Sequence, residues 1–413
     1  MTTCLSIASL GAQGDGIATV EGRPVYVPFT LPGEVVTAAR AKDRADLIAV
    51  IEPSPQRVAP PCRHFGTCGG CALQHMDMDA YLAWKRAKVV DALRGRGLDC
   101  VVADIVPCAP QTRRRAVMAA RRTEGGMLLG YYAAMSHRII DIEECPILRP
   151  GIVERLDDLR RLAGLVCATG DAFKIAVTAT DTGLDIAVEG AGKLPQPQRL
   201  KAGGFAIDNG FARLTVDGEI VVEPVKPAVS FGGAPVEVPP GGFLQATSQA
   251  EEAMAGLVVP HLKRAKRVAD LFSGAGTFAL RLAASSEIHA VEADAAALAA
   301  LDRGFRFAPG LKRVTAEKRD LFRRPLTFKE LNAYDGLIFD PPRAGAEDQS
   351  KQIARSGVPL VAAVSCNPVT FARDLGILAE GGYAIRSVTP IDQFLWSPHV
   401  EAVALLEKPR KRR

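Results

Sequence analysis

The stretch Asp270-Leu-Phe-Ser-Gly-Ala-Gly-Thr-Phe278 joins the end of an apolar run to a glycine turn and to the start of a helical segment. Three further apolar runs, at 288–292, 336–340 and 360–364, also end at a polar or glycine-containing turn. Such runs, separated by helical segments, are typical of a parallel sheet that helices cover on both faces. Residues 236–413 are therefore predicted to form an α/β domain that binds ligands beyond the carboxyl ends of its strands.

The glycine turn indicates what kind of ligand this domain binds. It lacks the third glycine of the dinucleotide fingerprint, so a nicotinamide cofactor is not favoured. Asp270 is acidic where a phosphate would need neutral or basic groups, and Glu292 ends the next apolar run, where a carboxylate can bind a ribose diol. A cofactor with a ribose and a positive charge but no phosphate fits, and S-adenosylmethionine is such a cofactor. For the glycines alone, a tight turn without a ligand is the alternative.

Length and composition set the broad class. The chain has 413 residues, 48% of them hydrophobic, which favours two or three domains with separate cores. No run of about 18 apolar residues is free of charge, and the N-terminus lacks the basic start and apolar centre of a signal peptide. We expect a soluble, cytoplasmic protein with no membrane partner.

The charge distribution is compatible with a nucleic-acid partner. Lys plus Arg exceed Asp plus Glu only by 51 to 46, but the basic residues cluster in Arg113-Arg-Arg115, in Arg121-Arg122 and in the terminal Lys408-Pro-Arg-Lys-Arg-Arg413. Basic clusters release counterions when they meet phosphates, so RNA or DNA is a natural partner. On charge alone, a solvated surface with a frayed tail remains equally open.

The first half of the chain divides at a proline-rich linker. Up to about residue 53, short β-type runs alternate with glycine turns, which predicts a small barrel. The linker around Pro53 to Pro61 leads to a cysteine-rich segment and then to a helix at 78–93, with Tyr81, Trp84 and Leu93 as candidate core residues. Residues 101–230 are expected to mix strands and helices.

Two motifs at strand ends then identify a family. Asp340-Pro-Pro-Arg-Ala-Gly345 and Ser365-Cys-Asn-Pro368 occur together with Phe243-Leu-Gln245, Arg319-Asp-Leu-Phe322 and His399-Val-Glu401. In this order and spacing, with the glycine turn and Glu292, they resemble the RNA uracil-5-methyltransferase family over nearly the whole chain. The resemblance implies a Rossmann-like class I methyltransferase domain at 236–413, a TRAM-like β-barrel of OB type at 1–55 and a central α+β iron–sulfur domain at 56–235.

The chemistry of this family explains a thiol at a strand end. Carbon 5 of uracil is a weak nucleophile, so a thiolate adds to carbon 6 and creates an enolate that takes the methyl group; a base then removes the proton from carbon 5. The resemblance makes Cys366 the nucleophile and Glu401 the base. A loop between a strand and a helix is expected to supply access and a lowered thiol pKa. The same matching gives a cofactor pocket of Gln245, Phe272, Thr277, Glu292, Asp320 and Asp340.

Phe243 has two possible roles. Aromatic side chains commonly stack on unpaired nucleotides, and the target uracil must be unstacked before a thiol can reach it. Packing in the core is the alternative for Phe243.

Three cysteines fall within ten residues, at Cys62, Cys68 and Cys71, and Cys145 is a candidate fourth. A disulfide is disfavoured in the cytoplasm, and both zinc and an iron–sulfur cluster fit four thiols. The resemblance implies a 4Fe-4S cluster bound by Cys62, Cys68, Cys71 and Cys145. It also favours 23S ribosomal RNA over transfer RNA as the substrate, and nothing requires more than a monomer.

Three other functions are weighed against this one. Cytosine methylation also uses a thiol adduct, but the Ser-Cys-Asn-Pro and His-Val-Glu pairing argues against it. Radical chemistry with the same cofactor needs a Cys-x3-Cys-x2-Cys motif, which is absent. A non-catalytic iron–sulfur protein that binds RNA is disfavoured because Cys366 and Glu401 are both present.

Overall fold

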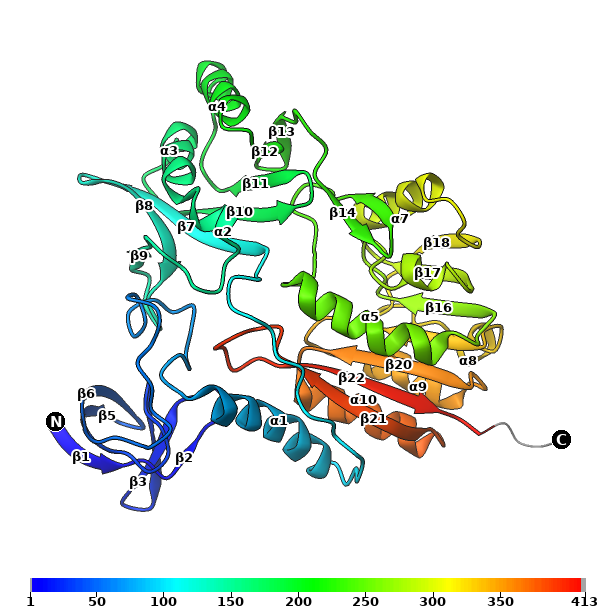
Figure 1. Ribbon diagram of the computed structural model, residues 1–413, viewed down its shortest axis with the longest axis horizontal. Coiled ribbons are helices and arrows are strands. Elements are labelled where there is room, and N and C mark those ends of the chain that lie inside the picture. Colours follow the sequence, from blue (N-terminus) through cyan, green and yellow to red (C-terminus); the bar gives the residue numbers. More distant parts are fainter. Residues whose placement is uncertain (1, 410–413) are drawn as a thin grey trace.

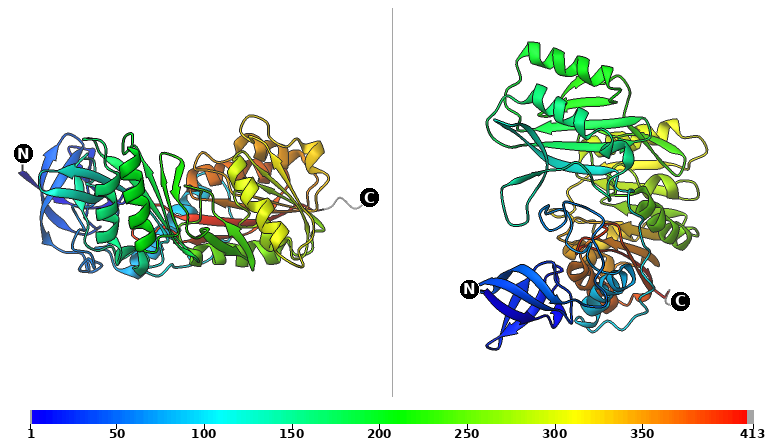
Figure 2. Two further views of the ribbon diagram at one scale, coloured as in Figure 1. Left: turned by 90° about the horizontal axis from the view of Figure 1, so that it is seen from above. Right: turned by 60° about the vertical axis from the view of Figure 1, so that its left-hand side comes forward.

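The computed structural model describes residues 2–409 and arranges them in three sheets and one separate hairpin. The N-terminal and central sheets lie on the left of Figure 1, and the C-terminal sheet lies on the right. The left view of Figure 2 shows the N-terminal and C-terminal sheets at opposite ends of the molecule. Within residues 2–409, no helix has both the length and the apolar character needed to cross a membrane.

The C-terminal sheet has seven strands in the order β18-β17-β16-β19-β20-β22-β21. The first five are parallel and β22 is antiparallel to both its neighbours. The strands are β16 (Arg267–Leu271), β17 (Glu287–Glu292), β18 (Val314–Lys318), β19 (Gly336–Phe339), β20 (Leu360–Ser365), β21 (Ala384–Ile391) and β22 (Glu401–Glu407). The strand order reverses between β16 and β19, so the ligand crevice of a doubly wound sheet is expected there. The predicted α/β architecture is confirmed.

Helices cover both faces of this sheet because successive side chains of each strand point to opposite faces. Ile338 and Ala362 pack on one side with α5 (Ser248–Leu262), α6 (Ala279–Leu282) and α7 (Ala295–Phe307). Phe339 and Ala363 pack on the other side. The helices there are α1 (Met78–Arg94), α8 (Phe328–Leu331), α9 (Glu347–Arg355) and α10 (Pro368–Glu380).

Helix α1 confirms the helix predicted at 78–93, and it packs against the C-terminal domain. Tyr81 and Leu93 are buried, whereas Trp84 is half-buried. The chain that follows α1 runs beside β21, where Val102 and Val106 form parallel bridges with Val388 and Ile391. An early segment of the chain therefore completes the hydrophobic core of the C-terminal sheet.

The N-terminal sheet has six strands in the order β1-β5-β6-β4-β3-β2. They are β1 (Thr2–Ser6), β2 (Ser9–Leu10), β3 (Gly16–Val20), β4 (Arg23–Val27), β5 (Val35–Ala41) and β6 (Arg44–Glu52). Its small apolar core includes Val25, Val27 and Val36. The Glu34 carboxylate, which has no solvent exposure, accepts hydrogen bonds from Arg57 and from the backbone N–H of Leu31. This contact fixes the start of the linker to the sheet.

The central sheet has the order β13-β12-β11-β10-β7-β8-β9. Its strands are β7 (Arg115–Thr123), β8 (Gly126–Tyr132), β9 (Ile139–Asp141), β10 (Phe173–Thr180), β11 (Gly183–Glu189), β12 (Arg213–Val216) and β13 (Glu219–Val222), and the helices near it are α2 (Pro150–Val153), α3 (Leu156–Val166) and α4 (Gln196–Asp208). The hairpin of β14 (Ala228–Phe231) and β15 (Ala234–Glu237) shares a hydrophobic cluster with Leu280 and Ala300 of α6 and α7. The hairpin thus belongs to the core of the C-terminal domain.

Candidate active site

The ends of neighbouring parallel strands carry the predicted site residues. Asp270 lies in β16, Glu292 ends β17, Asp340 follows β19 and Cys366 follows β20. The backbone turns sharply after β16, since Phe272, Gly274 and Gly276 all have positive φ, at 61°, 52° and 100°. A side chain at Gly274 would meet no atom within 4 Å, so this turn faces open space where a ligand could approach the backbone.

Glu292 fastens this glycine turn. Its Oε2 accepts a hydrogen bond from the Gly274 N–H at 3.0 Å, and its Oε1 accepts from Ala293 and Asp294 N–H at 2.6 and 2.9 Å. The carboxylate is therefore held in one orientation at the end of β17, as expected for a group that binds a diol.

Asp270 is a buried carboxyl group whose oxygens make no hydrogen bond of normal geometry, although the backbone of Ala279 acts to lower its pKa. Its side chain has no solvent exposure. Burial, together with the nearby Asp340, raises the pKa of Asp270 well above its ordinary value. A buried carboxyl group with so few partners is costly when ionised, so burial favours its neutral form.

A row of hydrogen bonds connects Asp340 to Glu401 across the site. Gln245 Nε2 donates to Asp340 Oδ2 at 2.9 Å. Gln393 Nε2 donates to Gln245 Oε1 at 3.0 Å and to Glu401 Oε2 at 2.8 Å. Burial raises the pKa of Asp340 to about 7, against the lowering effect of the Gln245 hydrogen bond. Burial and then Asp340 raise the pKa of Glu401 well above its ordinary value.

Cys366 lies directly before α10. The side chain of Asn367 caps this helix by accepting from the Val369 N–H, and Pro368 fits its first turn. The thiol is half-buried, and Glu401 and Asp340 are close enough to act on it electrostatically. Burial, then Glu401 and Asp340, raise the pKa of Cys366 to about 11, although Arg343 acts in the opposite direction. The expected lowered pKa is thus wrong for the ligand-free protein, because burial, with Glu401 and Asp340, outweighs the effect of Arg343.

The remaining predicted pocket residues, Phe272, Asp320 and Thr277, make their described contacts with other residues than Asp340, Glu401 and Cys366. Phe272 packs against Phe322, with ring centroids 5.4 Å apart. Asp320 Oδ1 accepts from the Phe322 N–H and so places that ring. For Thr277, the recorded contact is made by its backbone carbonyl, which accepts from Arg281. Phe243 is 67% exposed, so the core-packing alternative for this residue is wrong.

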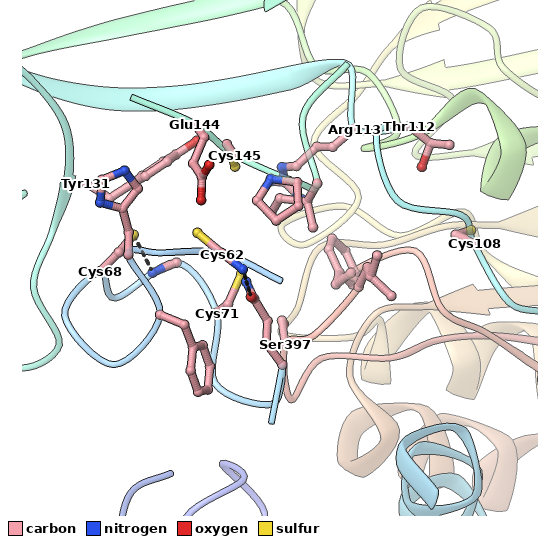
Figure 3. A pocket seen from close by; sticks show the side chains of 18 of the residues that line it. Cys62, Cys68, Cys71, Cys108, Thr112, Arg113, Tyr131, Glu144, Cys145 and Ser397 are labelled. Carbon is pink, nitrogen blue, oxygen red and sulfur yellow. Dashed lines mark hydrogen bonds between the residues drawn. The ribbon is translucent and has the colours of Figure 1, made fainter. Parts of the chain in front are cut away.

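The four cysteines of the predicted cluster line a single cavity of about 330 Å³, which also reaches Gln393 and His399. Figure 3 shows Cys62, Cys68, Cys71 and Cys145 gathered at one end and Cys108 at the other. The cysteine loop is tied to its surroundings by backbone hydrogen bonds: Gly69 N–H donates to Tyr132 O, and Ala72 N–H donates to Trp396 O. The loop therefore joins the central sheet to the segment that precedes Glu401.

Within residues 2–409, no three or more His, Cys, Asp or Glu side chains form a group that could bind one metal ion. All nine cysteines are free thiols. Burial is the main factor that raises the pKa of each of the four cavity cysteines, and for Cys71 it does so to about 12. Four half-buried thiols in one cavity are the kind of donor set that iron–sulfur clusters use, with one thiolate for each iron.

Sequence reasoning missed two groups around this site. Gln393 was not assigned to it, and no recognisable motif marks its position. Arg114, in a basic run that suggested RNA, is buried: its Nε donates to Gln245 O at 2.9 Å and it also pairs with Glu251. Of the terminal basic cluster, Arg410 to Arg413 lie outside the described residues.

Comparison with known proteins places this site in a family. The family model described as tRNA (Uracil-5-)-methyltransferase matches residues 236–409. An uncharacterized RNA methyltransferase of Mesorhizobium japonicum is 66% identical over the full length of both chains. The 23S rRNA (uracil(1939)-C(5))-methyltransferase RlmD of Halomonas elongata is 32% identical, over 98% of this chain and 89% of that protein.

A solved structure has the same fold over nearly the whole chain. The tRNA (uracil-54, C5)-methyltransferase of Pyrococcus abyssi, in complex with S-adenosyl-L-homocysteine, superposes with a TM-score of 0.75. It is 24% identical and covers 98% of this chain and 100% of its own. The chain described here belongs to the RNA uracil-5-methyltransferase family.

Proposed function

We propose that this protein methylates carbon 5 of a uridine in 23S ribosomal RNA. The observation that supports this best is the grouping of Cys366, Glu401 and Asp340 around one point at the carboxyl edge of the sheet. The Halomonas relative, which acts on 23S rRNA, supports ribosomal over transfer RNA. The Pyrococcus enzyme acts on transfer RNA, so the same reaction on transfer RNA is the alternative to be tested.

The reaction divides among the residues of the site as follows. Cys366 Sγ, as a thiolate, bonds to carbon 6 of the uracil, and the electrons of the carbon 5–carbon 6 double bond move to form an enolate. S-adenosylmethionine supplies the methyl group that becomes bonded to carbon 5. Glu401 then takes the proton from carbon 5, the double bond re-forms, and the carbon 6–sulfur bond breaks to return the thiolate.

The residues at the strand ends fit S-adenosylmethionine. Glu292 is oriented for a ribose diol, and the aromatic pair of Phe272 and Phe322 lies near the glycine turn. Gln245, Thr277, Asp320 and Asp340 complete the proposed pocket. Phe243 is exposed and is proposed to stack on the RNA.

The four cysteines fit a 4Fe-4S cluster, with Cys62, Cys68, Cys71 and Cys145 as ligands. Since methyl transfer involves no net oxidation or reduction, the cluster would serve to hold the cysteine loop together. We further propose that the six-stranded N-terminal sheet is a TRAM-type module that binds RNA and that the protein acts as a cytoplasmic monomer. Within residues 56–235, the cysteine loop and the central sheet would form the iron–sulfur domain, whereas α1 and the β14–β15 hairpin pack on the C-terminal domain.

The test uses a strain that lacks this gene and the purified protein. Mapping of 5-methyluridine in 23S rRNA and in transfer RNA should show the loss of a 23S site, which the purified protein and S-adenosylmethionine restore. Cys366→Ala should abolish this activity. Cys100→Ala, which changes another half-buried thiol that packs against the same domain core, should leave it intact. Loss of a transfer RNA site alone would favour the alternative substrate, and survival of every site would contradict the proposed function.

A further inference from the structure

Gln393 makes hydrogen bonds with every polar atom of its side chain, although neither a motif nor the reaction requires a residue there. Its side chain is buried, at 3% exposure. Its Oε1 accepts from the Ala246 N–H at 3.1 Å, and its Nε2 donates to both Gln245 and Glu401. Because a backbone N–H can only donate, Ala246 fixes which end of the amide is the oxygen, and the two donors must face Gln245 and Glu401.

The two oxygens of Glu401 are unequal as a result. Oε2 accepts from Gln393 at 2.8 Å, whereas Oε1 is buried and has no partner. A base that removes a proton in a water-poor site needs one free oxygen and a carboxylate that cannot rotate. The hydrogen bond from Gln393 meets the second requirement and leaves the first intact.

The backbone at Gln393 is itself anchored. The preceding residue, Asp392, has no solvent exposure and accepts hydrogen bonds from Tyr81 and Lys85 of α1. Lys85 also donates to Phe394 O at 2.8 Å. The amide of Gln393 therefore projects from a segment that is held on both sides.

We propose that Gln393 is a positioning residue that holds Glu401 for removal of the carbon 5 proton and connects this base to Gln245 on the cofactor side of the site. The inference rests on the proposed function, since it presupposes that Glu401 is the base. Gln393 touches neither reacting carbon in this account, so its loss should impair the elimination step more than the addition of the thiol or the methyl transfer.

The electrostatic surroundings of Glu401 predict the accompanying change with pH. Asp340 and Cys366 interact with it electrostatically, and Arg343 in turn acts on the Cys366 thiol. Burial and then Asp340 raise the pKa of Glu401, and the Gln393 hydrogen bond lowers it. Removal of that hydrogen bond should therefore move the pH midpoint of the elimination step upward.

The experiment separates the two halves of the reaction in a single turnover. RNA that contains the target uridine and S-adenosylmethionine with a labelled methyl group are mixed with the protein, and the labelled protein–RNA adduct and the free methylated RNA are followed over time. Gln393→Leu should form the adduct at nearly the normal rate but release product about tenfold to a hundredfold more slowly, as expected for loss of a hydrogen bond to a charged group. The midpoint of its release against pH should be higher than in the wild type.

Two further variants test whether slower release is specific to the hydrogen bond of Gln393. Gln349→Leu is the matched control, because Gln349 is a buried glutamine of the same domain whose side chain bonds only to the Leu326 backbone in the contacts described. It should show normal release. Gln393→Met keeps the length of the side chain but has no N–H to donate, and it should slow release as Gln393→Leu does. It provides the same test if the leucine variant does not fold.

RNA with 5-fluorouridine at the target checks folding independently, since its adduct requires Cys366 and the methyl donor but not the base. A Gln393 variant that forms this adduct and releases product at the wild-type rate would overturn the inference. Equal slowing of adduct formation and release would also overturn it, because that pattern indicates general disruption. If the wild type forms neither adduct nor methylated RNA, the proposed function fails instead, so the two failures are distinguishable.

Discussion

Removal of one partner of the buried ion pair between Lys85 and Asp392 should strongly destabilise this protein. Both side chains are 0% exposed, and they join α1 to the segment that leads to Gln393 and Glu401. Lys85→Met would leave the Asp392 carboxylate buried with Tyr81 as its remaining side-chain donor. Removal of one partner of a buried pair typically costs about 3–5 kcal/mol, a large fraction of the roughly 5–15 kcal/mol that stabilises a typical fold.

Urea denaturation followed by tryptophan fluorescence is the appropriate assay. The chain has two tryptophans, Trp84 in α1 and Trp396 in the segment after Asp392, so fluorescence reports on this contact. With a slope of about 2 kcal/mol per molar urea, Lys85→Met should lower the midpoint by about 1.5–2.5 M. Lys351→Met, which removes two solvent-exposed ion pairs, should change the free energy of unfolding by less than about 1 kcal/mol.

A double variant completes the test. Lys85→Met combined with Asp392→Leu removes both charges, so it should recover much of the stability that the single change loses. The reasoning is refuted if Lys85→Met unfolds within about 0.5 M urea of the wild type. It is also refuted if the double variant is as unstable as the sum of the two single variants.

Three further predictions concern the site itself. Because burial raises the pKa of Asp340 to about 7, ionisation of this carboxyl group increasingly destabilises the ligand-free fold as the pH rises from about 4 to 7. Asp340→Asn should therefore raise the melting temperature at pH 8 more than at pH 5. An equal rise in melting temperature at both pH values would contradict this prediction. The cationic sulfonium of S-adenosylmethionine should partly offset the carboxyl groups that contribute to the raised pKa of Cys366. Iodoacetamide should therefore label this thiol faster in the presence of S-adenosylmethionine than of S-adenosylhomocysteine, which lacks the charge. Equal labelling rates would contradict this prediction. Anaerobically purified protein should contain iron and acid-labile sulfide, and Cys71→Ser should lower the content of both. The control Cys167→Ser, which changes a thiol in the core of the central sheet, should not lower them. A wild-type protein that contains no iron after cluster reconstitution would refute the proposed ligands.

The strand ends were predictable from the sequence because one physical rule governs them. Parallel strands bring their carboxyl ends to the same edge, so the positions of Asp270, Glu292, Asp340 and Cys366 follow from four apolar runs. The resemblance to a family added Gln245 and Glu401, which precede and follow those strands. The structure then showed that both lie on the same row of hydrogen bonds.

The contacts that organise the site were not predictable in this way. Lys85 and Asp392 are 307 positions apart, and no local pattern indicates that they meet. The pKa of Cys366 was expected to be low because a helix follows it, but burial and then the carboxyl groups of Glu401 and Asp340 raise it. The helical period identified α1 correctly, whereas the domain that α1 covers depends on packing partners far along the chain.

Covalent trapping tests the central claim most directly. RNA with 5-fluorouridine at the target position cannot lose a proton from carbon 5, so the adduct should accumulate and survive denaturation. Mass spectrometry of the digested complex is expected to find one methylated 5-fluorouridine bonded to the peptide that contains Cys366. Absence of an adduct, or its attachment to another residue, would contradict the account.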